Sequence, residues 1–112
     1  MHILQFIREH NGEVSIANLE IETGFSARHL QRIFRNCVGI GPKLYCRIVR
    51  FRRAYKEILV GQDLTAIAHN RGFSDQSYFC REFKELSGFT PSEFRHLFSD
   101  VGFFQDQPYL KR

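Results

Sequence analysis

The segment GFSDQSYFCREFK, residues 72–84, decides how the chain is interpreted, because the similar segment GFSARHLQRIFR occupies residues 24–35. The two Gly-Phe-Ser triplets lie 48 residues apart, and from Leu30, which matches Phe79, the offset becomes 49. One residue is therefore inserted just after the second triplet. The match continues to a glycine and a proline in each copy, Gly39 with Gly88 and Pro42 with Pro91. The chain thus contains two copies of one unit.

Each copy predicts a short helix, a glycine turn and a longer helix, which is the helix-turn-helix arrangement. Glycine suits the turn because it adopts a left-handed conformation at little cost. We expect Phe25 and Phe73 to fill the corner between the two helices of their copies. Ser26 and Ser74 are expected to cap the second helix, whose free N–H groups would suit a phosphate.

The whole chain is predicted to be all-α, because glycines follow the apolar runs and Ser, Thr or Asp precede them. We predict seven helices, forming two helix-turn-helix (homeodomain-like) subdomains joined by a long central helix. The expected helices cover about 2–11, 15–22, 26–39, 42–60, 64–70, 75–87 and a segment starting at the capping box Thr90-Pro91-Ser92-Glu93. The domain plan is a first subdomain at 1–41, a linker helix at 42–61, a second subdomain at 62–99 and a C-terminal tail at 100–112.

Positive charge is concentrated in one part of the chain. The net charge of the 112 residues is only +4, but nine of the 16 Lys and Arg residues lie between Thr23 and Lys56, where no acidic residue occurs. Such a stripe within a folded segment favours a polyanion-binding surface over a merely solvated one. Residues 63–99 instead carry a net charge of −1. We therefore expect the first subdomain to supply most of the affinity.

The cysteines and the termini point to a cytosolic protein without a cofactor. Cys37, Cys46 and Cys80 are odd in number and form no CxxC motif, which indicates neither a disulfide framework nor a zinc site. No signal peptide and no membrane span are expected. We expect no cofactor, no metal and no catalytic residue.

The outer faces of the two longer helices carry the candidate DNA-reading side chains. Arg and Gln are the residue types that contact base edges in the major groove. Arg28, Gln31, Arg32 and Arg81 are the leading candidates, and the full predicted set of base contacts is Arg28, His29, Gln31, Arg32, Gln76, Ser77, Cys80 and Arg81. The predicted phosphate contacts are Ser26, Arg35, Lys43, Ser74 and Lys84. Some of these residues have alternative roles. Cys80 is small and could be neutral filler, and His29 could be a hydrogen-bonded residue at the edge of the surface. Arg35 and Lys84 could contact only water.

Beyond this residue-level interpretation, residues 3–99 resemble the DNA-binding domain of the AraC/XylS family of bacterial transcription regulators. The resemblance rests on LQRIF (30–34) with Gly39 and Pro42, RFRRA (50–54), IAHNRGFSDQSYFCREFK (67–84) and GFTPSEFR (88–95). It implies that the third and sixth helices enter successive major-groove segments, about 34 Å apart. It also implies a promoter operator of double-stranded DNA and, as in most members, activation through RNA polymerase. Most members carry a separate effector or dimerisation domain, so we expect this chain to be either a stand-alone regulator or one domain of a longer protein. No membrane partner is implied.

Two departures and two alternatives accompany this resemblance. Glu20 stands where the second copy has Ala68, and we expect it to turn outward or to loosen the first subdomain. Glu82 matches Ile33 of the first copy, so the apolar stripe of the helix expected at 75–87 is narrower than that of the helix at 26–39. An enzyme such as an alkyl-repair protein is disfavoured because no Pro-Cys-His-Arg segment occurs. A protein-interaction module that keeps the fold without reading DNA is the other alternative.

The apolar tail is expected to pack on the second subdomain, or else to dock a regulatory domain.

Overall fold

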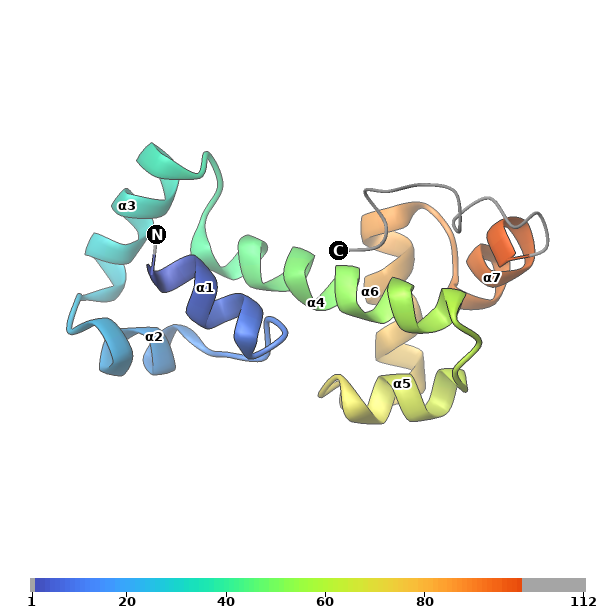
Figure 1. Cartoon of the computed structure of the whole chain (residues 1–112). Coiled ribbons are helices and arrows are strands. Elements are labelled where there is room, and N and C mark those ends of the chain that lie inside the picture. Colours follow the sequence, from blue (N-terminus) through green and yellow to red (C-terminus); the bar gives the residue numbers. More distant parts are fainter. Residues whose placement is uncertain (1, 100–112) are drawn as a thin grey trace. The chain divides into compact units, whose positions relative to one another are not determined.

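The described part of the chain, residues 2–99 of the computed structural model, is entirely helical and contains no strand (Figure 1). Its elements are α1 (His2–Glu9), α2 (Ile16–Thr23), α3 (Ala27–Cys37), α4 (Pro42–Leu59), α5 (Leu64–Asn70), α6 (Gln76–Ser87) and α7 (Pro91–Ser99). Seven helices in the predicted order confirm the all-α fold with two helix-turn-helix motifs. The predicted tail, 100–112, lies outside the described residues. Two compact units divide between Arg50 and Phe51, inside α4.

The first unit encloses a core built from α1, α2, α3 and the beginning of α4 (Figure 1). Its buried members are Ile3, Ile7, Leu19, Leu30, Phe34 and Cys46. Leu30 and Phe34 stand four residues apart on α3, so one stripe of that helix is buried while the opposite face reaches solvent. The core therefore fixes which side of α3 is available to a ligand.

The loop between α1 and α2 approaches α4 very closely at Gly12. This residue is buried with a φ of +76°, and a β-carbon built there would lie 2.3 Å from the Cys46 carbonyl oxygen and 2.7 Å from the Arg50 nitrogen. Its N–H donates to the Ile7 carbonyl oxygen at 2.9 Å, which ends α1. Only glycine fits here, because any side chain would collide with the backbone of α4.

The second unit is held together by a chain of aromatic rings. Phe83 lies 4.8 Å from Phe51 and 5.3 Å from Phe94, measured between ring centroids, so α6 joins α4 to α7. The buried set is Ala54, Ile58, Ile67, Ala68, Phe73, Phe79, Phe83 and Phe94. Offset and edge-on aromatic pairs of this kind add about 0.5–1.5 kcal/mol each beyond burial.

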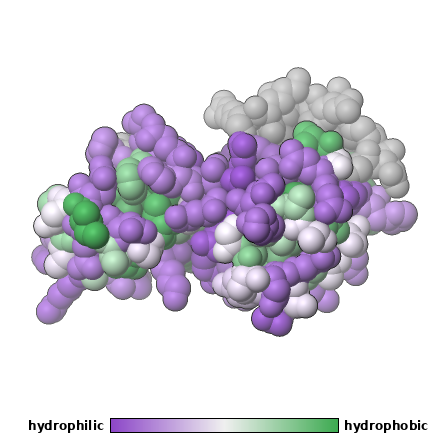
Figure 2. All heavy atoms as spheres, turned by 90° about the horizontal axis from the view of Figure 1, so that it is seen from below, coloured by the Kyte–Doolittle hydropathy of each residue, from purple (hydrophilic) through white to green (hydrophobic). Residues whose placement is uncertain are grey.

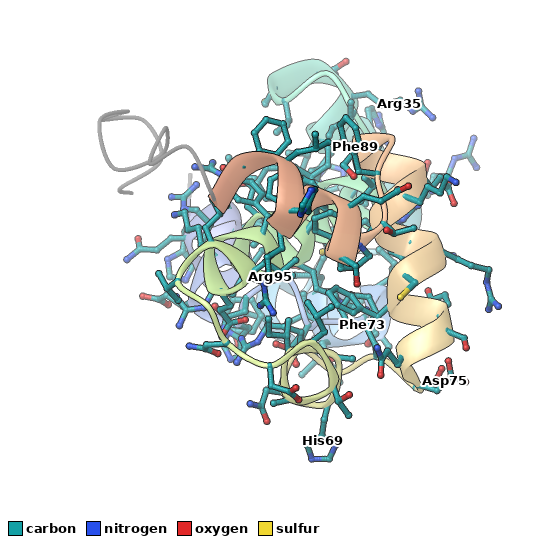
Figure 3. All side chains as sticks on the ribbon, turned by 90° about the vertical axis from the view of Figure 1, so that its right-hand side faces the viewer. Arg35, His69, Phe73, Asp75, Phe89 and Arg95 are labelled. Atoms are coloured by element: carbon teal, nitrogen blue, oxygen red, sulfur yellow. The ribbon has the colours of Figure 1, made fainter. Side chains whose placement is uncertain are left out.

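Two arginines, Arg95 and Arg71, hold the end of α4 within the second unit. The Arg95 guanidinium donates to the Ile58 carbonyl oxygen at 3.3 Å and also to the Gln62 carbonyl oxygen. A cation at a helix C-terminus satisfies exposed carbonyls and complements the helix dipole. Glu57 forms an ion pair with Arg71 at 3.3 Å. Figure 3 shows Arg95 beside α4.

Most of the predicted caps are confirmed, but one is wrong. Ser26 accepts from the His29 N–H at 3.1 Å, and Thr90 and Glu93 form the predicted reciprocal capping box. The Thr90 backbone N–H and hydroxyl lower the pKa of the Glu93 carboxyl. At the start of α6, however, Asp75 and not Ser74 is the cap, with its carboxylate accepting from the Tyr78 N–H at 2.7 Å. The inserted residue shifts the cap by one position, and a carboxylate is as good an acceptor as a hydroxyl.

The corner prediction holds in one copy only. Phe73 is 8% exposed and packs on Phe79, whereas Phe25 is 39% exposed and lies edge-on against His29 at 4.7 Å. We attribute the difference to the residue on the preceding helix. Ala68 leaves room for a ring, while Glu20 crosses the corner and accepts from the Ala27 N–H at 3.1 Å. Glu20 therefore does not turn outward, because its carboxylate links α2 to α3, and the alternative that it loosens the first unit stays a prediction.

Candidate nucleic-acid interface

The exposed side of α3 carries a continuous polar strip, hereafter the α3 strip: Arg28, Gln31, Arg32 and Arg35. All four side chains are exposed, and their spacing of three and four residues places them on one face, opposite Leu30 and Phe34. Three guanidinium groups and one amide offer many hydrogen-bond donors along this face. The strip has the chemistry needed to contact guanine, adenine and phosphate.

The start of α3 is less open to an anion than the sequence predicted. The Ser26 hydroxyl is used by the His29 N–H, and the Glu20 carboxylate takes the Ala27 N–H. Ser26 itself is exposed, and His29 is half-buried against the exposed ring of Phe25. A carboxylate near the positive end of the helix dipole competes with a phosphate for that position. The start of α3 therefore offers an anion fewer free donors than its capping serine alone would suggest.

Exposed apolar side chains also lie in the first unit. Figure 2 shows hydrophobic atoms among the hydrophilic surface of this unit, whose exposed large apolar residues are Ile21, Phe25 and Leu44. Phe25 directly precedes the cap of α3, so its ring lies at the beginning of the helix that carries the α3 strip. An aromatic ring there can contact the methyl group of thymine.

The corresponding face of α6, hereafter the α6 strip, comprises Ser77, Cys80, Arg81 and Lys84. Ser77, Arg81 and Lys84 are exposed and Cys80 is half-buried, opposite the buried Phe79 and Phe83. Two cations replace the three of α3, and acidic Asp75 sits at the helix start (Figure 3). The α6 strip is therefore a weaker electrostatic surface than the α3 strip.

Two neighbours constrain predicted readers on α6. The Gln76 side-chain oxygen accepts from the Thr65 hydroxyl at 2.8 Å, which holds Gln76 against α5. The Arg81 guanidinium carbon lies 6.0 Å from the ring centroid of Tyr78, a cation–π distance that restricts where Arg81 points. Tyr78 is 37% exposed and was not among the predicted site residues. Tyr78 stands three residues before Arg81 on the same helix, and this spacing could have indicated the contact from the sequence.

Two further predicted residues, Ser74 and Lys43, lie outside the two strips. Ser74 is exposed just before the Asp75 cap, and the negative charge of that carboxylate disfavours a phosphate beside it. Lys43 is exposed in the first turn of α4. Further along α4, Arg52 and Arg53 are exposed and Lys56 is half-buried. Burial, Arg52 and Arg53 together lower the pKa of Lys56.

The three cysteines are free thiols that differ in burial. Burial raises the pKa of the Cys46 thiol to about 11, so it stays protonated and unreactive at neutral pH. Cys37 is exposed and Cys80 half-buried. Residues 2–99 contain no group of three or more His, Cys, Asp or Glu side chains that could hold a metal ion. Nor does any described helix have the length and hydrophobicity to cross a bilayer.

Comparison with known proteins connects this geometry to a family. The family described as a helix-turn-helix domain matches residues 19–96. The bifunctional transcriptional activator/DNA repair enzyme Ada of Escherichia coli is 32% identical over 88 residues, which cover 79% of this chain and 25% of Ada. The F1 operon positive regulatory protein of Yersinia pestis is 33% identical over 96 residues, covering 83% of this chain and 32% of that protein.

A solved structure with the same fold is also available for comparison. The structure of a probable AraC family transcriptional regulator from Rhodopseudomonas palustris superposes with a TM-score of 0.70 at 25% identity, covering 85% of this chain and 92% of that one. By contrast, the chain spans only about a quarter to a third of the length of the curated relatives described above. The similarity thus concerns one domain-sized part of those relatives.

Proposed function

Because the chain belongs to the AraC-type helix-turn-helix family of DNA-binding transcription regulators, we propose that it recognises a specific double-stranded sequence through both α3 and α6. The observation that carries the proposal is the α3 strip, in which four exposed donor-rich side chains stand opposite a fully buried stripe. A helix of this kind fits the major groove, where arginine bonds guanine and glutamine bonds adenine. The second helix-turn-helix motif offers a comparable but less basic surface.

The residue roles follow from exposure and position along each helix. We assign base contacts to Arg28, Gln31, Arg32 and Arg81, with His29, Gln76, Ser77 and Cys80 as flanking contacts. We assign Arg35, Lys43 and Lys84 to phosphates, since exposed lysine and arginine side chains commonly contact the DNA backbone. Ser26 and Ser74 keep the same assignment, although nearby carboxylates weaken it. Tyr78 joins the set as the residue that orients Arg81.

The domain plan supports reading of two adjacent sites by one chain. We propose that residues 1–41 and 62–99 act as separate reading subdomains and that 42–61 spaces them. Helix α4 has 18 residues, which corresponds to about 27 Å. Successive major-groove segments on one side of the duplex lie about 34 Å apart. We therefore propose two half-sites one helical turn apart, which selection of bound sequences tests directly.

Regulation of transcription, and activation in particular, is proposed by analogy with the relatives. The names of two of them include a transcriptional activator and a positive regulatory protein. We propose that contact with RNA polymerase follows DNA binding, and that effector binding or dimerisation belongs to a further domain, as the greater length of the relatives suggests. A chromosomal ligand implies a cytoplasmic, nucleoid-associated location. We propose no enzymatic activity for this domain.

Selection of bound sequences from a random duplex pool tests the proposal. Two enriched blocks about 10 base pairs apart are expected, and Arg32→Ala and Arg81→Ala should each relax one block. If about six phosphates are contacted, the logarithm of the binding constant should fall with the logarithm of salt concentration with a slope of about −5. Absence of enrichment combined with a flat salt response would reject DNA reading in favour of a protein-interaction module.

A further inference from the structure

Three cations lie close together on the second half of α4 and are not among the residues assigned to DNA. This α4 triad is Arg52, Arg53 and Lys56, whose spacing of three and four residues to Lys56 places all three on one side of the helix. Arg52 and Arg53 are exposed. Burial lowers the pKa of the Lys56 ammonium group first, and the positive charges of Arg52 and Arg53 lower it further, so the three cations repel one another. An anionic partner would relieve this repulsion.

The core of the second unit separates the α4 triad from the α6 strip. Ala54 and Ile58 of α4 are buried in the same cluster as Phe79 and Phe83 of α6, so the two helices turn these faces toward each other. The triad stands on the opposite side of α4 and the α6 strip on the opposite side of α6. The two charged surfaces therefore project from opposite sides of this unit. If α6 faces DNA, as in the proposed function on which this step rests, the triad faces away from that duplex.

We propose that the α4 triad is a docking surface for an acidic segment of a partner protein. Two guanidinium groups offer planar donor pairs that match carboxylates, and the lysine adds a third positive charge. Val60 extends this surface. Its N–H donates to the Lys56 carbonyl oxygen at 3.1 Å, which places it one helical turn after Lys56, and its side chain is 74% exposed. A segment that alternates carboxylates with an apolar residue would contact both features.

The size of the surface favours a protein over a second nucleic acid. From Arg52 to Val60 the helix rises only about 12 Å. Non-specific binding of a duplex depends on neutralising many phosphates along a longer footprint. Three cations beside an exposed valine are too few for that mode but sufficient for a short acidic peptide.

The test compares two ligands and two charge-matched triple variants. The first ligand is a fluorescein-labelled 15-residue peptide made of five Glu-Leu-Asp repeats. The second is a 24-base-pair duplex taken from the selected pool. The first variant is R52Q/R53Q/K56Q, and the control is R28Q/R32Q/R35Q, which removes the same charge from the α3 strip. Circular dichroism confirms that each variant is folded. If the first variant does not fold, Arg53→Gln alone is expected to weaken peptide binding about threefold.

We expect a reciprocal pattern. The α4 variant should weaken peptide binding at least tenfold and change duplex binding less than twofold, and the α3 variant should do the reverse. Equal weakening of peptide binding by both variants would overturn the proposal, because it would show non-specific attraction. Loss of duplex binding in the α4 variant would assign the triad to nucleic acid, which would also overturn the proposal. A Kd above about 1 mM for the peptide and the wild-type protein would overturn the proposal as well. Failure of the wild type to bind the duplex rejects the proposed DNA function separately, whatever the peptide does.

Discussion

Replacing Gly12 by alanine should selectively destabilise the first unit. The loop that carries Gly12 is pressed against the backbone of α4, where an added β-carbon would lie 2.3 Å from the Cys46 carbonyl oxygen. Ordinary contacts with a β-carbon begin at about 3.4 Å, so the loop or α4 has to move by about 1 Å. The two atoms nearest to the added carbon, the Cys46 carbonyl oxygen and the Arg50 nitrogen, both belong to the backbone of α4, so no flexible side chain can move aside.

The magnitude follows from two separate costs. A left-handed conformation costs a residue with a β-carbon about 1–2 kcal/mol. Overpacking a tight contact costs about a further 1–3 kcal/mol, which gives a total of about 2–5 kcal/mol. At the usual stability of about 0.05–0.15 kcal/mol per residue, a unit of some 50 residues has roughly 3–7 kcal/mol. The substitution should therefore remove most of the stability of the first unit.

Gly24→Ala is the matched control, since Gly24 has the same φ of +76° but nothing within 4 Å of the added carbon. Urea unfolding followed by circular dichroism should show a loss of about 1–2 kcal/mol for Gly24→Ala. Gly12→Ala should lose clearly more, and the difference measures the collision with α4. Equal losses for the two variants would refute the reasoning, because strain in φ alone would then explain both.

Two further predictions concern the candidate interface, and a third concerns the core of the first unit. Arg32→Ala and Arg81→Ala should each weaken binding to the selected duplex by about 1–3 kcal/mol. The larger loss is expected at Arg32, because the first unit is more basic. Fluorescence-anisotropy titration measures both losses, and an equal or larger loss at Arg81 contradicts this ranking. Glu20→Gln, which removes a negative charge from the start of α3 while keeping an acceptor, should raise duplex affinity a few-fold at low salt, and an unchanged or lower affinity would show that this helix end does not approach phosphate. Because its raised pKa of about 11 keeps the Cys46 thiol protonated below that pH, iodoacetamide at pH 8 should label Cys37 and spare Cys46, as read by peptide mass spectrometry; rapid labelling of Cys46 in the folded protein would contradict its burial.

The sequence repeat was sufficient to predict the architecture. Glycine turns, caps and the buried spacing of Leu30 and Phe34 are local features, and each appears at its expected place to within a residue or two. The exposed face of α3 followed directly from that periodicity. These elements were predictable because neighbouring residues alone determine them.

Features that depend on contacts between elements were missed or misjudged. Phe25 and Phe73 occupy the same place in the repeat, yet a single difference on the preceding helix, Glu20 in place of Ala68, leaves one ring exposed and the other buried. The collision space at Gly12 likewise depends on α4, which lies more than 30 residues away in sequence. Pattern alone does not report such tertiary neighbours.

The position of the unit boundary inside a continuous helix has a consequence for cleavage and for expression of fragments. A loop between the units would give a protease a place to cut and would release two intact pieces. Here the backbone at Arg50 and Phe51 is helical, so its amides and carbonyls are held in the helical hydrogen-bond ladder and resist entry into a protease cleft. A fragment beginning at Phe51 would also start with uncapped amides. Limited digestion should therefore spare this junction, and a fragment that contains the second unit should begin at Pro42.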